Sequence, residues 1–213
     1  MTYYVKEIYY TLQGEGANSG RPAVFCRFSG CNLWSGREQD RPIAVCNFCD
    51  TDFVGTDGAG GGIFSHCESL ASAIASHWPS LSSSIARRFV VFTGGEPLLQ
   101  LDGVLIQALH KIGFSVAVET NGTCTPPEGI DWLCVSPKGG TELVVRAGQE
   151  LKLIYPQSAL KPGDFIRLNF DHFFLQPMAG PHLKANTQSA VDYCLAHPTW
   201  RLSLQMHKVV GIP

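Results

Sequence analysis

Three of the eight cysteines have a spacing suited to a metal centre. They lie at Cys31, Cys46 and Cys49, so that fourteen residues separate the first two and a CxxC pair closes the window. Two thiolates at CxxC spacing can bind one metal centre, and the third cysteine supplies a further ligand. The other five stand among apolar residues, where a cysteine is typically a small buried hydrophobe. These are Cys26, Cys67, Cys124, Cys134 and Cys194.

Two kinds of metal centre fit this window. Zinc takes four ligands, and His66 or Cys67 could complete such a site. A four-iron cluster held by three cysteines instead leaves one iron open for a substrate or a cofactor. A closed structural zinc needs no pocket beside it, whereas an open cluster does. The cysteines alone leave both possibilities open.

A glycine loop favours the open cluster. Gly94-Gly-Glu-Pro97 follows the apolar run 89–92 and the polar residue Thr93. Glycine lets backbone carbonyls approach a ligand closely, and an ammonium group, which only donates hydrogen bonds, needs such acceptors. A second glycine stretch, residues 58–62, has no GK[ST] sequence and no helical pattern after it, which predicts a flexible linker rather than a phosphate-binding loop.

Short β-rich runs alternate with helical patterns along the chain. The predicted strands are residues 23–28, 89–92, 114–118, 132–135, 151–154, 173–175 and 200–204. Helices are expected from a capping box at Ser65-x-x-Glu68 through Trp78, from residue 101 to 112 before Gly113, and over residues 187–197. Strands separated by helices predict a parallel sheet with right-handed crossovers.

A polar cluster follows almost every predicted strand. The clusters are residues 29–31, 93–97, 119–122, 136–138, 176–177 and 205–208. In a parallel barrel the carboxyl ends of the strands form the active face. Because 213 residues is short for eight strand–helix units, we predict an α/β fold, an abridged and partly open (β/α) barrel of about six parallel strands, in a single domain spanning residues 1–213.

Composition excludes several classes of protein. Hydrophobic residues make up 45% of the chain, which is enough for a core and argues against disorder. The net charge of −2 gives no field that would attract a nucleic acid. No apolar run approaches the ~20 residues of a membrane span, and residues 1–7 lack the pattern of a secretory signal. We therefore expect a cytoplasmic enzyme without nucleic-acid or membrane partners.

Taken together, these features resemble the radical S-adenosylmethionine (SAM) superfamily and, within it, the 7-carboxy-7-deazaguanine synthase family. The motifs are Gln13-Gly-Glu-Gly16, Phe25-x-Arg27-x-x-Gly-Cys31-Asn-Leu33, Cys46-x-x-Cys49-Asp-Thr51, Glu119-Thr-Asn-Gly122, Ser136-Pro-Lys138 and Gln205-x-His-Lys208. The resemblance runs from Tyr9 to Pro213. The usual spacing of the superfamily is CxxxCxxC, so the path of residues 32–45, for which a small extra helix is one option, is left open.

The resemblance implies a lyase reaction with defined cofactors and partners. The substrate would be 6-carboxy-5,6,7,8-tetrahydropterin, and ring contraction with loss of ammonia would give 7-carboxy-7-deazaguanine for queuosine biosynthesis. The cofactors would be a [4Fe-4S] cluster, SAM and Mg²⁺; they would carry the radical chemistry while the protein positions the reactants. A homodimer and an external electron donor such as flavodoxin are also implied.

The resemblance also assigns residues. Cys31, Cys46 and Cys49 would hold the cluster, and Thr51 would contribute to Mg²⁺ binding. The implied cofactor-binding residues are Phe48, Cys49, Asp50, Gly94, Gly95, Glu96, Ser136, Pro137, Lys138, Gln176, Pro177, Met178 and Ala179. The implied substrate-binding residues are Leu12, Gln13, Gly14, Glu15, Arg27, Thr93, His207 and Pro213.

Several of these residues have a specific expected role. Arg27 would bind the substrate carboxylate as a bidentate donor, and Gln13 and Glu15 would meet the guanine-like edge. Glu119, which could reach the cofactor ribose or the substrate, and His207 are the candidate acid–base groups, although no acid or base is assigned. A structural ion pair at Arg27, an ordinary turn at residues 13–16, a helix cap at Thr51 and a solvated surface lysine at Lys138 are the alternatives.

The chain end has an expected path of its own. Eight residues after Gln205 span at most about 26 Å, which is enough to fold back over the barrel mouth, and residues 209–213 are apolar, which favours packing over fraying. The α-carboxylate of Pro213 would then lie near the pocket, or the tail would only close the open side of the barrel.

Two other functions share part of this pattern. A glycyl-radical activating enzyme has the same cluster, cofactor and barrel but needs an open groove for a protein loop. A zinc-stabilised binding module needs only the cysteines.

Overall fold

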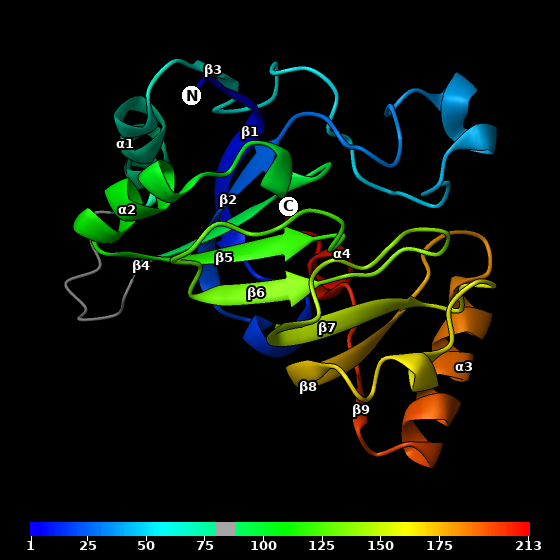
Figure 1. Cartoon of the computed structure of the whole chain (residues 1–213). Helices are drawn as coiled ribbons and strands as arrows, with labels where there is room; N and C mark the ends of the chain where they lie inside the picture. Colours follow the sequence, from blue (N-terminus) through cyan, green and yellow to red (C-terminus); the bar gives the residue numbers. More distant parts are fainter. Residues whose placement is uncertain (80–87) are drawn as a thin grey trace.

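The computed structural model describes residues 1–79 and 88–213, which build one nine-stranded sheet in the order β3-β1-β2-β4-β5-β6-β7-β8-β9. The strands are β1 (Tyr3–Leu12), β2 (Pro22–Phe28), β3 (Gly62–Phe64), β4 (Arg88–Gly94), β5 (Phe114–Thr120), β6 (Trp132–Val135), β7 (Ala147–Tyr155), β8 (Asn169–Pro177) and β9 (Trp200–Leu202). From β2 to β9 the neighbours are parallel, whereas β1 is antiparallel to both β2 and β3. In the described part of the chain β3 and β9 are edges, so the barrel is open (Figure 1).

The predicted fold class is confirmed, with seven parallel strands where about six were expected. All seven predicted strands are present. Strands β1 and β3 were not predicted. In β1 the alternation of buried and exposed residues breaks at Lys6 and Glu7, where a register shift interrupts the pairing with β2.

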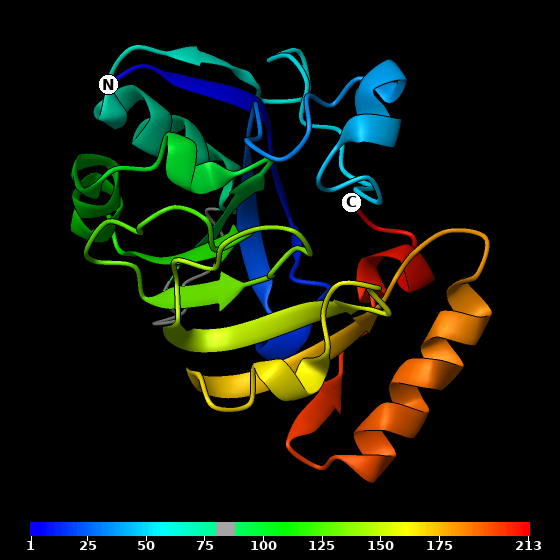
Figure 2. The same ribbon diagram turned by 45° about the vertical axis from the view of Figure 1, so that its right-hand side comes forward.

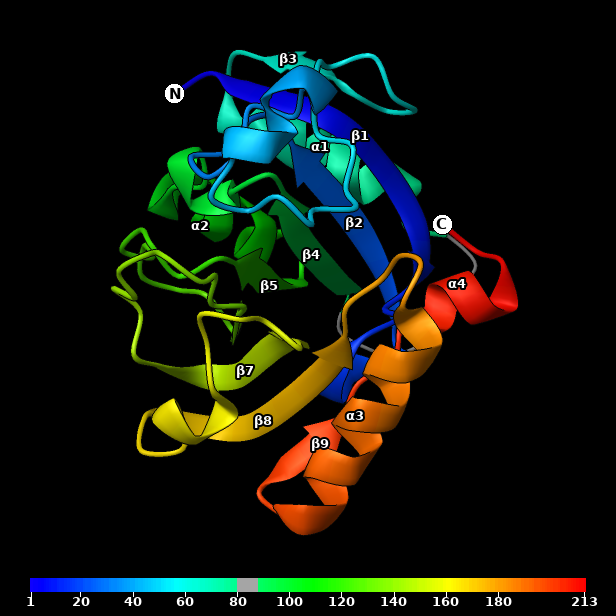
Figure 3. The ribbon, with the colours of Figure 1, turned by 90° about the vertical axis from the view of Figure 1, so that its right-hand side faces the viewer.

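Four α-helices accompany the described strands. They are α1 (Cys67–His77), α2 (Gly103–Lys111), α3 (Leu183–Ala196) and α4 (Met206–Val210). Helices α1 and α2 pack together beside the early strands, and α3 runs along β8 and β9 (Figures 1 and 3). None of the described helices is long and apolar enough to cross a membrane. Short 3-10 turns complete the chain: η1 (Gly16–Asn18), η2 (Glu38–Ile43), η3 (Pro97–Leu99) and η4 (Pro162–Asp164).

The helix starts only partly follow the prediction. The capping box at Ser65 is wrong, because His66 is the N-cap of α1 and no side chain caps that end. At α2 the cap is Asp102, whose carboxylate accepts a 2.9 Å hydrogen bond from the Leu105 amide and another of 3.0 Å from the Tyr3 hydroxyl. The helix gives way to Gly113, whose φ of 83° is in the left-handed region that glycine tolerates.

The two faces of the sheet carry different residues. Successive strand residues point to opposite faces, and one face packs Val90, Val116 and Leu151 against the helices. On the other face, Phe89, Val91 and Ala117 form a second, smaller apolar cluster, and Glu119 and Lys152 line a cavity. The strand period therefore separates the hydrophobic core from the polar site.

Two loops that the sequence treated as a flexible linker or left open have a defined structure. The glycine stretch is not a flexible linker, because Gly58 donates to the Lys6 carbonyl at 2.9 Å and a Cβ at Gly61 would lie 2.2 Å from that same oxygen. Residues 32–45 contain η2, which is the small extra helix left open by the sequence.

Candidate active site

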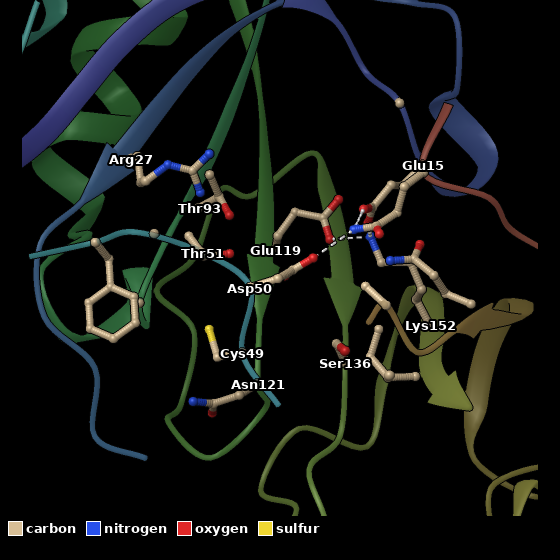
Figure 4. Close-up of a pocket in the computed structure, with 18 of the residues that line it drawn as sticks. Glu15, Arg27, Cys49, Asp50, Thr51, Thr93, Glu119, Asn121, Ser136 and Lys152 are labelled. Carbon is tan, nitrogen blue, oxygen red and sulfur yellow. Dashed lines mark hydrogen bonds and ion pairs between the residues drawn. The ribbon is translucent and has the colours of Figure 1, made fainter. Parts of the chain in front are cut away.

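A cavity of about 370 Å³ lies against the inner face of the sheet, at the carboxyl ends of the parallel strands (Figure 4). Most of the residues assigned by sequence line it. They are Leu12, Gln13, Gly14, Glu15, Arg27, Cys31, Cys46, Phe48, Cys49, Asp50, Thr51, Thr93, Gly94, Gly95, Glu119, Ser136, Lys138, Gln176, Pro177, Met178, Ala179, His207 and Pro213. The strand order thus brings distant motifs around one space.

Glu96 and Pro137 are the two assigned residues that the structure does not bring into the cavity lining. The Glu96 side chain is fully buried, and its carboxylate accepts 2.7 Å hydrogen bonds from the Thr120 hydroxyl and the Asn121 amide and a 3.0 Å bond from the Leu98 amide. Burial raises the pKa of Glu96 even though these donors oppose the shift. Its carboxylate ties the glycine loop to the end of β5.

The glycine pair permits a close approach of two backbones. A Cβ at Gly94, whose φ is 135°, would lie 2.2 Å from the Phe28 carbonyl oxygen, and one at Gly95 would lie 2.7 Å from the Cys31 Cβ. The Glu96 amide donates to the Gly30 carbonyl at 3.0 Å. Side chains at these positions would push the β4 loop away from the first cysteine.

Three thiols face the cavity and suit an open cluster. A hydrogen bond with the Cys46 thiol lowers the pKa of Cys49 to about 6 and, together with burial, raises that of Cys46. Neither His66 nor Cys67 lines the cavity, so neither supplies zinc with a fourth ligand there. In residues 1–79 and 88–213 no three His, Cys, Asp or Glu side chains are grouped so that they could hold a single metal ion.

Residues that the sequence analysis did not single out hold the CxxC turn. Arg41 on η2 donates from Nη1 to the carbonyls of Asn47 and Cys49, each at 2.9 Å, and its guanidinium lies 4.1 Å from the Trp34 ring centroid. Trp34 packs edge-on against Phe53. Trp34 and Arg41 lie between the first two cysteines in the sequence, and this pairing of an aromatic residue with an arginine could have indicated the support.

Arg27 is both ion-paired and in the cavity wall. Its Nε donates to Glu7 at 2.7 Å and its Nη2 to the Tyr9 hydroxyl at 3.0 Å. Arg27 pairs across the sheet with Thr93, and in Figure 4 these two residues and Thr51 share one side of the view. The structural ion pair therefore coexists with a position suited to ligand binding.

Two alternatives for single residues are wrong. Lys138 is not a solvated surface lysine, since its Nζ donates to the Ser136 carbonyl at 2.5 Å and to the Ser136 hydroxyl at 2.8 Å beside the cavity. Burial lowers the pKa of Lys138, with Cys46 and Cys49 opposing the shift. Thr51 caps no helix, because the residues after it are irregular.

A buried lysine connects two of the assigned carboxylates. Lys152 Nζ lies 2.7 Å from Glu15 Oε2 and 2.7 Å from Glu119 Oε2. Burial alone would raise the pKa of Glu15, but Lys152 and Gln205 hold it below its ordinary value. The sequence predicts a strand at Lys152 but no role for its side chain. A lysine within the apolar run 151–154 was the signal that was missed, because a charge there needs partners.

The chain end folds back onto the cavity, as predicted, and does so through α4. The Met206 amide donates to the Gly14 carbonyl at 2.9 Å, and a Cβ at Gly14 would lie 2.3 Å from His207 Nδ1. The Thr11 hydroxyl donates to a Pro213 oxygen at 3.0 Å, and Lys208 pairs with Asp50 at 2.6 Å. The C-terminus therefore lies beside the cysteine loop (Figure 2).

The chain was compared with known proteins. No family model matches it. The 7-carboxy-7-deazaguanine synthase of Bordetella pertussis is 63% identical over 213 residues, and that of Caulobacter vibrioides is 61% identical, each match covering 100% of both chains. The crystal structure of QueE from Escherichia coli has a TM-score of 0.66 and 29% identity, covering 97% of this chain and 95% of that one. The chain belongs to the 7-carboxy-7-deazaguanine synthase family of radical SAM enzymes.

Proposed function

We propose that this chain, acting as one domain over residues 1–213, converts 6-carboxy-5,6,7,8-tetrahydropterin into 7-carboxy-7-deazaguanine with loss of ammonia, in queuosine biosynthesis. The observation that carries the proposal is the convergence of three thiols, the glycine loop and the Glu15–Lys152–Glu119 cluster on one cavity. A glycyl-radical activating enzyme is disfavoured because α4 and the chain end lie against the cavity, where a protein loop would have to enter.

The cysteine side of the cavity would hold the cofactors. Cys31, Cys46 and Cys49 would bind a [4Fe-4S] cluster with one iron open, beside the loop of Gly94 and Gly95. When bound, the cluster and SAM supply one-electron reduction and hydrogen-atom abstraction. Phe48 and Asp50, Ser136 and Lys138, and residues 176–179 would form the walls of the SAM site, as their places in the cavity lining allow.

The opposite charges of the cavity favour one orientation of the substrate. Arg27, held by Glu7 and Tyr9, would bind the carboxylate. Glu15 and Glu119 would accept hydrogen bonds from the amine and ring N–H groups at the other end. Figure 4 places Arg27 and Glu15 on opposite sides of the view, as this orientation needs.

Magnesium and proton transfer would involve neighbouring residues. Mg²⁺ keeps several substrate and water oxygens and needs few protein ligands, so the Thr51 hydroxyl beside Arg27 would suffice. Burial lowers the pKa of His207, which favours the neutral imidazole, the form that can act as a base. Glu119 is the second candidate for this role.

External partners complete the proposal. Ile43 and Val45, beside Cys46, are 87% and 47% exposed and would form an apolar approach to the cluster for a donor such as flavodoxin. Leu195 and Val209, 78% and 73% exposed, would be covered in a homodimer. We place the enzyme in the cytoplasm, where reduced thiols are maintained.

The test is anaerobic incubation of the cluster-reconstituted protein with SAM, a reductant and the carboxypterin. Formation of 7-carboxy-7-deazaguanine and ammonia, detected by mass spectrometry and an ammonia assay, supports the proposal. SAM cleavage that proceeds without any deazaguanine would overturn it. The variant Cys46→Ala, treated in the same way, is the control for background chemistry.

A further inference from the structure

Lys152 is buried beside the cavity, between two carboxylates that come from the turn after β1 and from the end of β5. Its side chain is 4% exposed, and its Nζ reaches Glu15, in the turn after β1, and Glu119, at the end of β5, at 2.7 Å each. A buried charge must be paired to be tolerated. Lys152 therefore cannot be replaced by a neutral residue without leaving both carboxylates unbalanced.

Each of these two carboxylates also has an amide donor. Gln13 Nε2 donates to Glu119 Oε1 at 3.1 Å, and Gln205 Nε2 donates to Glu15 Oε1 at 3.1 Å. One oxygen of each group thus takes the lysine and the other takes an amide, which fixes the plane of the carboxylate. A carboxylate oxygen can accept two hydrogen bonds, so acceptor capacity remains for a ligand.

Other titratable groups face Lys152 from the surrounding elements. They are Glu150 on β7, Cys134 on β6, Lys138 after β6 and His207 on α4. Glu150 accepts a 3.0 Å hydrogen bond from the Ala17 amide, and burial raises its pKa although Lys152 opposes the shift. The lysine charge is thus directed mainly to the two carboxylates that line the cavity.

We propose that Lys152 is a positioning residue that holds the carboxyl groups of Glu15 and Glu119 as a fixed pair of hydrogen-bond acceptors, and that this pair selects ligands whose edge carries adjacent N–H donors, such as a 2-amino-4-oxopyrimidine. An edge with an acceptor in place of either donor would face a carboxylate oxygen and be rejected. Lys152 acts through the two glutamates and does not itself touch the substrate. The inference rests on the proposed function, which supplies the pterin as the ligand.

The test uses Lys152→Met, which keeps an unbranched side chain only one heavy atom shorter and removes its charge. We expect the KM for the carboxypterin to rise at least tenfold, while iron content and SAM affinity stay at wild-type values. Because the pKa of Glu15 is no longer held down, the acid limb of kcat/KM moves to higher pH. Lys6→Met is the matched control, since Lys6 also pairs with two carboxylates, Asp52 at 3.2 Å and Asp57 at 2.8 Å.

A second pair of variants keeps the proposal testable if the Lys152→Met protein does not fold. Glu15→Gln/Glu119→Gln and the triple variant Glu15→Gln/Glu119→Gln/Lys152→Met remove both carboxylate charges that Lys152 pairs with. Their KM values should agree within about threefold, because Lys152 then has no carboxylate left to position. A rise in KM by the same factor when Lys152→Met is introduced into the wild-type background and into the Glu15→Gln/Glu119→Gln background would overturn the positioning role. So would unchanged KM and pH profile in a folded Lys152→Met protein. A wild-type enzyme that makes no deazaguanine would instead overturn the proposed function and, with it, the ligand named here.

Discussion

Two walls of the cavity hold their side chains in different ways. We call them the strand wall, which carries Arg27, Glu119 and Lys152, and the loop wall, which carries Cys31 and the CxxC pair. Arg27, Glu119 and Lys152 project from strands whose neighbours fix the backbone by parallel or antiparallel pairing. Cys31 and the CxxC pair lie in a segment with long backbone contacts, such as Cys46 amide to Leu33 carbonyl at 3.4 Å. The strand wall is thus preorganised without a ligand, whereas the loop wall depends on side chains such as Arg41 and would depend on the cluster that we propose it binds.

The two walls also differ in whether their charged groups have partners within the protein. On the strand wall each charge has a partner, as in the Arg27–Glu7 and Lys152–Glu15 pairs. On the loop wall the thiols face each other and the buried Lys138. Since deprotonated thiols are what a metal binds, the proposed cluster would complete the loop wall, whereas the protein itself completes the strand wall.

The largest effect should come from breaking the loop wall. Replacing Cys31, Cys46 or Cys49 by Ala should abolish cluster assembly, because three thiolates are the minimum for this kind of cluster. Iron analysis and the visible absorption of the reconstituted protein check it. Cys26→Ala and Cys194→Ala should keep full iron content, and equal iron loss from either variant would show that the ligand set is wrong.

A substitution in the strand wall should leave the cluster intact and lower kcat/KM for the substrate. Arg27→Lys replaces a forked donor by a point charge, and the lost charge-assisted bond of roughly 1.5–3 kcal/mol corresponds to a fall in kcat/KM of about 10- to 150-fold. SAM affinity, measured by equilibrium binding, should stay unchanged. A parallel fall in SAM affinity would mean that the Glu7 ion pair is the whole role of Arg27.

A smaller effect is expected where the chain end meets the strand wall. Extending the chain by a few residues beyond Pro213 should raise the substrate KM severalfold, because the α-carboxylate beside Thr11 would be displaced. Thermal unfolding should stay within a few degrees of the wild type. A C-terminally tagged enzyme with unchanged KM would leave the tail with a packing role alone.

The smallest effect is expected where the two walls are joined. Lys208 and Asp50 form a half-exposed ion pair, with side chains 49% and 43% exposed, and such pairs contribute about 0–1 kcal/mol. Lys208→Met should therefore change KM for SAM and substrate by less than about fivefold. A change of a hundredfold would show that the junction, rather than either wall, organises the cavity.

The two walls also differ in how far the sequence predicts them. The cysteines and the glycine loop are local patterns, and the seven parallel strands follow from apolar runs, so both were predicted. The partners of Arg27 and Lys152 were not, because they depend on the pairing of distant strands: Glu15 and Lys152 are 137 residues apart in the chain. For the same reason the sequence predicted Glu96 at the cofactor, whereas its buried carboxylate accepts hydrogen bonds from Thr120 and Asn121 at the end of β5.

The central claim is that Arg27 binds the carboxylate end of the substrate and Glu15 its amine end. The most direct test compares the binding of the carboxypterin with that of the same pterin lacking its carboxylate, in the reconstituted enzyme with SAM. Wild type should prefer the carboxylated ligand, Arg27→Lys should lose that preference, and Glu15→Gln should weaken both ligands by the same factor. If Glu15→Gln abolishes the preference while Arg27→Lys retains it, the substrate lies the other way round and the account is contradicted.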